Sequence, residues 1–102
     1  MVKRDRITRV GEHKAALYTT IPQRLARASG VAAQASGSWG VIGRRLSFRA
    51  NTLGTTYKIN TKGGTTRVAI PVGLAAALGI GRGTWLEWRR TGEVLYAKRV
   101  DL

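Results

Sequence analysis

Cysteine is absent from this chain of 102 residues, and histidine occurs once, at His13. The absence of thiols excludes disulfide bonds, thiolate metal sites and a cysteine nucleophile. A single histidine in a polar stretch argues against a metal site, which needs several ligands. The sequence contains no recognisable Ser-His-Asp set, HExxH motif or pair of carboxylates with a base. We therefore predict that the chain is not an enzyme and holds no metal or cofactor.

Long apolar runs are also missing. The longest mostly apolar stretch, "VAIPVGLAAALGI" at residues 68–80, is too short to span a bilayer. The N-terminal sequence "MVKRDRITR" is basic but lacks the apolar segment of a signal peptide. These absences predict a soluble protein of the cytoplasm.

Acidic residues are too few to balance the basic ones. Five Asp and Glu residues stand against 18 Lys and Arg residues, which gives a formal net charge of +13. Because hydrophobic residues make up 43% of the chain, we expect a folded core and not a disordered basic tail. Such a charge attracts polyanions, and nucleic acid is the partner expected at this size. A membrane surface is disfavoured, because no basic amphipathic helix is visible.

An internal repeat is the main pattern in the sequence. The segments "TIPQRLARASGV" (residues 20–31) and "AIPVGLAAALGI" (residues 69–80) are identical at six of twelve positions at an offset of 49. The same offset aligns Trp39 with Trp88 without a gap. One register that continues beyond a single helix indicates a duplication. We predict two copies, at residues 4–50 and 55–100, whose join lies within "RANTLGTT" (49–56).

Each copy has the pattern of a β-β-α-β-β unit. The first strand ("DRITRV" or "TTYKIN") leads into a polar, basic loop ("GEHKAA" or "TKGGTT"), and a second short strand runs into a proline. The proline starts a helix of about two turns and a glycine ends it; these residues are Pro22 and Gly30 in copy one, and Pro71 and Gly79 in copy two.

A hairpin closes each copy, with its expected turn at residues 43–44 in copy one and 91–92 in copy two. Elements this short cannot form a core alone. We therefore predict a mainly β fold with short helices, in which the two repeats share one small barrel-like core as one globular unit.

The segments "KGGTTRVAIPVGLAAALGIGRGTWLEW" and "HKAALYTTIPQRLARASGV" resemble the AbrB/MazE/SpoVT swapped-hairpin domain. In that family two β-β-α-β-β units interleave their hairpins into one small dimer, and this tandem duplication resembles a single-chain version of it. The family comprises DNA-binding proteins: transition-state regulators, antitoxins and small chromatin-type proteins of archaea. The resemblance implies a double-stranded DNA-binding protein of the nucleoid or a transcriptional regulator, located on the chromosome.

The resemblance also implies which residues contact DNA, because family contacts come from basic residues on the first strand, the loop, the second strand and the helix. The N-terminal basic cluster adds two arginines whose alternation places them on one strand face. The predicted DNA-binding residues are Arg4, Arg6, Arg9, Lys14, Arg24, Arg27, Lys58, Lys62 and Arg67.

The two copies differ at three of the matching positions, so we expect unequal surfaces and low sequence specificity. The differing pairs, with copy one first, are Arg24 and Gly73, Arg27 and Ala76, and Tyr18 and Arg67. We expect affinity to come chiefly from phosphate contacts.

The hairpins carry a second group of arginines. They either form a second basic surface that bridges to another duplex or only solvate the turns; they are Arg44, Arg45, Arg89 and Arg90. Equivalence in the repeat places Trp39 and Trp88 in the core, whereas the opposite strand parity places Trp85 at the surface.

Two other classes of function stay open. One is an antitoxin-like or scaffold protein with a protein partner, and the other is an RNA-binding protein. Co-purification with a stoichiometric partner would favour the first, and preference for structured RNA in competition with duplex DNA would favour the second. The duplication allows either a monomer or a homodimer.

Overall fold

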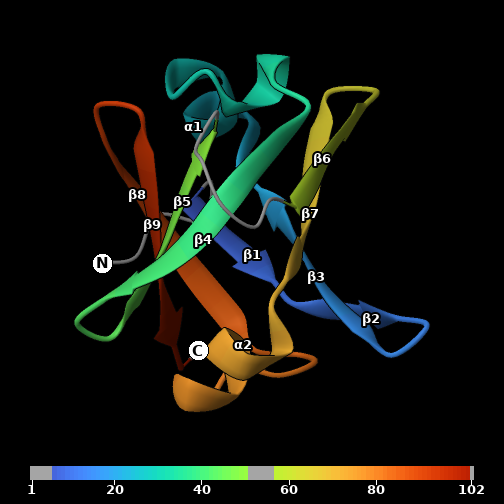
Figure 1. Cartoon of the computed structure of the whole chain (residues 1–102), viewed down its shortest axis with the longest axis vertical. Helices are drawn as coiled ribbons and strands as arrows, with labels where there is room; N and C mark the ends of the chain where they lie inside the picture. The colour runs from blue at the N-terminus through green and yellow to red at the C-terminus, as the bar shows by residue number, and fades with distance from the viewer. Residues whose placement is uncertain (1–5, 51–56, 102) are drawn as a thin grey trace.

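The computed structural model describes residues 6–50 and 57–101, in which short strands predominate. The strands are β1 (Ile7–Arg9), β2 (Gly11–His13), β3 (Ala16–Ile21), β4 (Ser36–Ile42), β5 (Arg45–Ala50), β6 (Tyr57–Lys62), β7 (Thr65–Ile70), β8 (Trp85–Thr91) and β9 (Val94–Val100) (Figure 1). The helices are α1 (Gln23–Ala28), the 3-10 turn η2 (Val31–Ala33) and α2 (Val72–Ala77). The residues predicted to join the two copies lie largely outside the described ranges.

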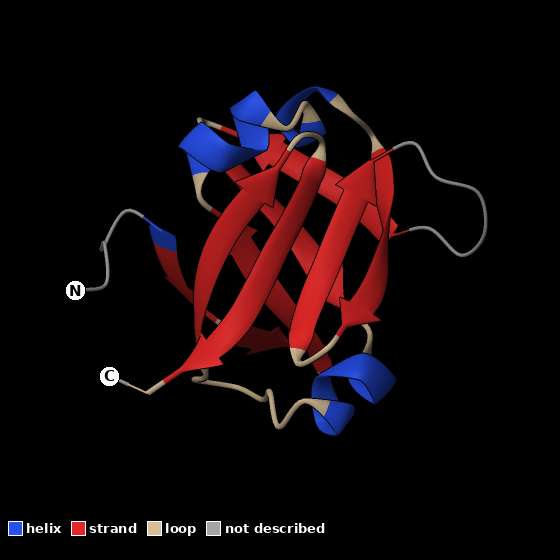
Figure 2. Cartoon of the chain, turned by 90° about the vertical axis from the view of Figure 1, so that its left-hand side faces the viewer, coloured by secondary structure: helices blue, strands red, loops and turns tan. Residues whose placement is uncertain are grey.

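The strands form one antiparallel sheet in the order β1-β8-β9-β5-β4-β6-β7-β3-β2. Its ends approach each other, because Thr8 Oγ1 on β1 lies 3.2 Å from Thr19 Oγ1 on β3. The sheet is therefore nearly closed and barrel-like, with α1 and η2 at one end and α2 at the other (Figure 2). The mainly β class with short helices is confirmed. In the ranges described, no helix has the length and apolar character needed to cross a membrane.

Strand pairing relates the two parts of the chain by a pseudo-two-fold axis. Adding 49 to the residue numbers of β3, α1 and β4 gives the bounds of β7, α2 and β8. At two places a residue pairs with its own counterpart 49 positions later: Thr19 pairs with Val68, and Ser47 pairs with Tyr96. The axis therefore passes through both pairs, which lie in two different parts of the sheet.

The first strand of each half also pairs with the other half. Strand β1 pairs with β8, and β6 pairs with β4 as well as with β7 of its own half, so the first strand of each half borders the strand that follows the helix in the other. Each half consequently completes the sheet of its counterpart.

The core draws on both halves. Its largest fully buried side chains include Trp88, Phe48, Leu46, Leu86 and Leu95. As predicted from the repeat, Trp88 is buried, with its Nε1 donating to Thr8 Oγ1 at 2.8 Å, and Trp39 packs against this core, with its Nε1 donating to the Ala69 carbonyl at 2.8 Å. The prediction for Trp85 is also confirmed, since that residue is 37% exposed.

One part of the core is packed differently in the two halves. A Cβ built on Gly37 would lie 2.5 Å from Phe48 Cζ and 2.7 Å from the Arg49 carbonyl oxygen. The counterparts of Gly37 and Phe48, 49 positions later, are Leu86 and Ala97. One half therefore combines the small Gly37 with the large Phe48, whereas the other half combines the large Leu86 with the small Ala97.

The helix boundaries follow the predicted proline and glycine signals. Gly30 and Gly79 adopt positive φ, at 82° and 68°, directly after the last helical turn, as predicted. Pro22 and Pro71 stand one position before the helices and not inside the first turn. Their carbonyls nevertheless accept the first helical hydrogen bonds.

The loops predicted within residues 11–16 and 61–66 are wrong in length. Strand β2 occupies part of the first range and β6 extends into the second, which leaves turns of only two residues. Both central residues of each turn have positive φ, a conformation whose twist matches that of the flanking strands. At the far hairpins, the predicted turn at residues 43–44 is confirmed, whereas the other turn is at residues 92–93 and not 91–92. The positive φ falls on Gly92.

The turn between β2 and β3 holds two non-glycine residues in the left-handed region, Lys14 at φ 51° and Ala15 at φ 65°. The equivalent turn uses Gly63 and Gly64. We expect Ala15→Gly to raise the free energy of unfolding by roughly 0.5–1 kcal/mol, because it removes a steric clash with Cβ. Gly64→Ala should lower it by a similar or larger amount. Urea unfolding of both variants measures the effect, and a destabilised Ala15→Gly variant would contradict it.

Candidate nucleic-acid interface

The outward side of β2, β3, β7 and β6 forms a polar and basic surface, here called the hairpin face. Alternation along the strands directs one set of side chains outward, while Thr19, Ile59, Thr66 and Val68 are buried. The outward residues that define the hairpin face are His13, Tyr18, Thr20, Lys58, Asn60, Lys62, Thr65 and Arg67.

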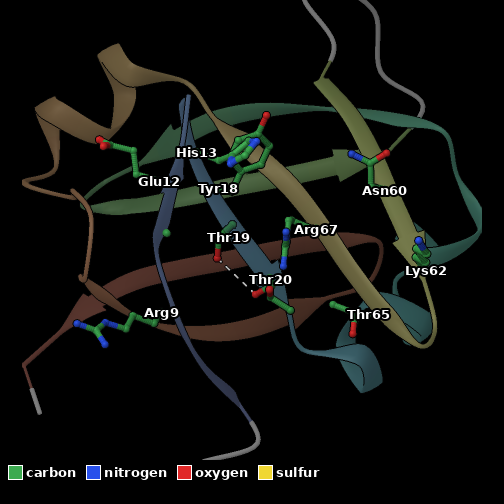
Figure 3. A pocket seen from close by; sticks show the side chains of 11 residues that line it. Arg9, Glu12, His13, Tyr18, Thr19, Thr20, Asn60, Lys62, Thr65 and Arg67 are labelled. Carbon is green, nitrogen blue, oxygen red and sulfur yellow. Dashed lines mark hydrogen bonds between the residues drawn. The ribbon is translucent and has the colours of Figure 1, made fainter. Parts of the chain in front are cut away.

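Arg67 lies at the centre of this face. It is paired with Thr20 on β3 and with Asn60 on β6, and Lys62 is paired with Thr65 one step further along. An open hollow of about 670 Å³ lies over these residues (Figure 3). Cations flanked by hydroxyl and amide groups provide the donors that commonly bind phosphate oxygens.

Helix α1 is fixed to the turn of the β6–β7 hairpin by Gln23. In the amide orientation that satisfies its neighbours, the Gln23 nitrogen donates to Thr66 Oγ1 at 3.1 Å and to the Gly64 carbonyl at 2.6 Å. Its oxygen accepts a hydrogen bond from Arg27 Nε at 3.2 Å. The helix of the first half therefore borders the hairpin of the second half.

This arrangement gathers the basic residues of the two halves at one end. Arg24 and Arg27 are exposed on α1, and Lys62 and Arg67 are exposed on the adjacent hairpin. We call these four residues the basic end. Basic residues that are far apart in the sequence are therefore carried on neighbouring elements.

The end where α2 lies carries cations from other elements: Arg44, Arg45, Lys98 and Arg99 line one hollow with Ala77 at the end of α2. Helix α2 presents Val72, which is 62% exposed, together with Gly73 and Ala76. The hairpin face carries His13 and Tyr18 where its other half has Lys62 and Arg67. The two helices therefore differ in charge, because α1 carries Arg24 and Arg27 where α2 has Gly73 and Ala76.

Arg9 and Lys14 do not join the basic end. The Arg9 guanidinium carbon lies 5.5 Å from the centre of the Trp85 ring, a cation–π distance, and it points away from Arg67 (Figure 3). Lys14 occupies the β2–β3 turn. Both residues are exposed, but they contribute at the margin of the surface.

The N-terminal and hairpin arginines lie elsewhere. Arg6 borders a different hollow together with Arg45, Arg89 and Arg90, so it lies away from the hairpin face, and its role in DNA binding stays a prediction. The cause is the pairing of β1 with β8, which carries this part of the chain to the other side of the barrel. Arg44 lies in the β4–β5 turn, and the predicted Arg4 is outside the described residues.

One carboxylate lies beside the hairpin face, because Glu12 on β2 lines the hollow over it. Of the carboxylates in the described ranges, Glu87 lies 3.9 Å from Arg89 Nε and 3.7 Å from Lys98 Nζ. Among these same residues, Lys58, Lys62 and Arg67 make no ion pair, so their charges are available to an external anion. No three His, Asp or Glu side chains in this part of the chain lie close enough to hold a metal ion.

The sequence analysis missed Asn60, Thr65 and Thr20 as members of the face. The signal was available, because Asn60 falls midway between Lys58 and Lys62 in a strand with a period of two. Thr65 lies in a range predicted as a loop. Thr20 lies in a predicted strand whose outward-facing side was not predicted.

The site is thus an open, basic sheet surface that a helix extends at one end. Its chemistry suits a polyanion more than a small molecule, because the hollow is open and its cations are dispersed over several strands. Comparison of the chain with protein-family models, with curated proteins and with solved structures gives no match.

Proposed function

We propose that this chain binds double-stranded DNA through the hairpin face, mainly by contacts to phosphates. The observation that carries the proposal is the contact of α1 with the β6–β7 turn, in which Gln23 bonds to Thr66 and Gly64. Helix α1 and the β6–β7 hairpin carry four exposed cations, Arg24, Arg27, Lys62 and Arg67, which outnumber the one carboxylate, Glu12, that lines the hollow of the hairpin face, and this balance favours a polyanionic ligand.

We further propose that the fold is a tandem swapped-hairpin domain of the AbrB type, formed by one chain. Three features support this: the element bounds that recur after 49 residues, the pairing of β1 with β8 and of β6 with β4, and the proline–helix–glycine order in both halves. On this basis the protein acts on the chromosome as a nucleoid-associated protein or a transcriptional regulator.

Low sequence specificity is part of the proposal. Phosphate contacts hold a duplex without reading its sequence, whereas base recognition needs several side chains that reach the base edges. Asn60 and Arg67 are the adjacent pair on the hairpin face best suited to such contacts, so any base preference should depend on them.

A double substitution tests the binding surface. We expect Lys62→Gln with Arg67→Gln to weaken binding of a short random duplex about tenfold at about 0.1 M salt, because each lost phosphate contact reduces counterion release. Fluorescence anisotropy measures the affinity. Arg44→Gln with Arg82→Gln is the matched control, since it removes the same charge from exposed positions outside the hairpin face.

Equal losses in the two double variants would contradict the proposal, because they would show that only total charge matters. Thermal unfolding confirms that each variant is folded. Competition with structured RNA completes the test: RNA that displaces the duplex at lower concentration would replace DNA as the ligand.

A further inference from the structure

A second basic surface lies on the outward side of β8, β9, β5 and β4, which we call the rear face. Alternation along these strands leaves Leu46, Phe48, Leu86, Trp88 and Leu95 buried and directs the intervening residues outward. The outward residues that define the rear face are Arg45, Ser47, Arg49, Glu87, Arg89, Tyr96 and Lys98.

The pseudo-two-fold axis crosses the middle of this face. Ser47 and Tyr96 pair on the axis, and Arg49 and Lys98 occupy equivalent positions on either side of it. Arg89 pairs with Tyr96 on the neighbouring strand. The cations therefore surround a central pair of hydroxyl-bearing side chains.

Positive charge on the rear face exceeds what its carboxylate can neutralise. Glu87, whose side chain is only 13% exposed, lies within 4 Å of both Arg89 and Lys98 and can offset one of them. In the part of the chain that is described, Arg45 and Arg49 make no ion pair. Arg6 adds another cation, because it lines the same open hollow as Arg45 and Arg89.

We propose that the rear face binds the backbone of a second DNA duplex, so that one molecule bridges two duplexes. This inference rests on the proposed function, in which the hairpin face holds the first duplex. The chemistry matches, since arginines and a lysine bind phosphate oxygens, and Ser47 and Tyr96 add hydroxyl donors. We expect the rear face to bind DNA more weakly than the hairpin face, because Glu87 offsets part of its positive charge.

The geometry keeps the two duplexes apart. The axis passes through Thr19–Val68 on the hairpin face and through Ser47–Tyr96 on the rear face, so the two faces lie on opposite sides of the barrel. The molecule measures 30 × 30 × 28 Å. The screening length is about 10 Å at about 0.1 M salt, so repulsion between the duplexes is largely screened across this width.

A capture experiment tests the bridge. One duplex is immobilised, the full chain is added below saturation, and retention of a second, fluorescent duplex is measured. We expect retention by the unmodified protein and a loss of about tenfold in Arg45→Gln with Arg49→Gln, because two phosphate contacts disappear. Arg82→Gln is the control here, because it removes an exposed cation outside both defined faces, and it should retain the fluorescent duplex.

Anisotropy with a single duplex separates the two proposals. If Lys62→Gln with Arg67→Gln leaves single-duplex binding unchanged, the proposed function fails; if single-duplex binding is normal but no second duplex is retained, only the bridge fails. Retention that survives Arg45→Gln with Arg49→Gln overturns the bridge and indicates a dimer joined back to back, which light scattering detects. Retention of a fluorescent RNA hairpin in place of the duplex also overturns it.

Discussion

Raising the salt concentration from about 50 to about 200 mM is expected to weaken duplex binding at the hairpin face by about 500-fold. Five cations carry this expectation, and they are Arg24, Arg27, Lys58, Lys62 and Arg67. Each phosphate contact contributes about −0.9 to the slope of log affinity against log salt, so five contacts give a slope of about −4.5. Measurement in the Arg45→Gln and Arg49→Gln background restricts binding to the hairpin face.

Removing the basic end should flatten this dependence. Glutamine at Arg24, Arg27, Lys62 and Arg67 leaves Lys58 as the remaining cation of the five, so we expect a slope of about −1. Affinity titrations at several salt concentrations give the slope directly. A slope that stays near its original value would mean that other cations bind the phosphates, and the assignment of the basic end would then be wrong.

The second large effect concerns the core. We expect Gly37→Ala to lower the free energy of unfolding by about 3 kcal/mol, at the upper end of overpacking effects. The new Cβ would meet Phe48 at 2.5 Å and the backbone carbonyl of Arg49 at 2.7 Å, and a backbone atom cannot move aside without disturbing the sheet. Urea unfolding monitored by tryptophan fluorescence measures the loss.

Two further variants test whether the packing clash at Gly37 causes the loss of stability. Phe48→Leu combined with Gly37→Ala should recover part of the stability, because the ring supplies two of the three close contacts of the added Cβ. Gly73→Ala is the matched control: nothing lies within 4 Å of its added Cβ, and alanine favours the exposed helix by about 1 kcal/mol. Equal destabilisation by Gly37→Ala and Gly73→Ala would contradict the packing argument.

The sequence predicted the elements of this fold better than their arrangement. The repeat of 49 residues, the helix ends at Gly30 and Gly79 and the burial of Trp88 all follow from local patterns. The two short hairpin turns were predicted as longer loops. Lys14 and Ala15 carry no strong turn signal, whereas Gly63 and Gly64 do, but the polar residues beside both turns were assigned to the loops and not to strands.

The candidate site was only partly predictable for a different reason. Lys58, Lys62 and Arg67 share one strand pair, so alternation could place them together. The contact of Gln23 with Gly64 joins segments about 40 residues apart, and it depends on the exchange of strands between the halves. The same exchange carried Arg6 away from the hairpin face. Local sequence contains no signal for such tertiary pairing.

Because both halves belong to one chain, their sequences can differ, and the two ends of the molecule need not be alike. In a symmetric assembly of two identical chains, every substitution is repeated by the symmetry, so an arginine-bearing end would necessarily occur twice. Here Gly37 beside Phe48 faces Leu86 beside Ala97 across the axis, and each half has changed without its counterpart changing likewise. The arginines of α1 therefore have no counterpart on α2, and the two ends of the molecule are not equivalent.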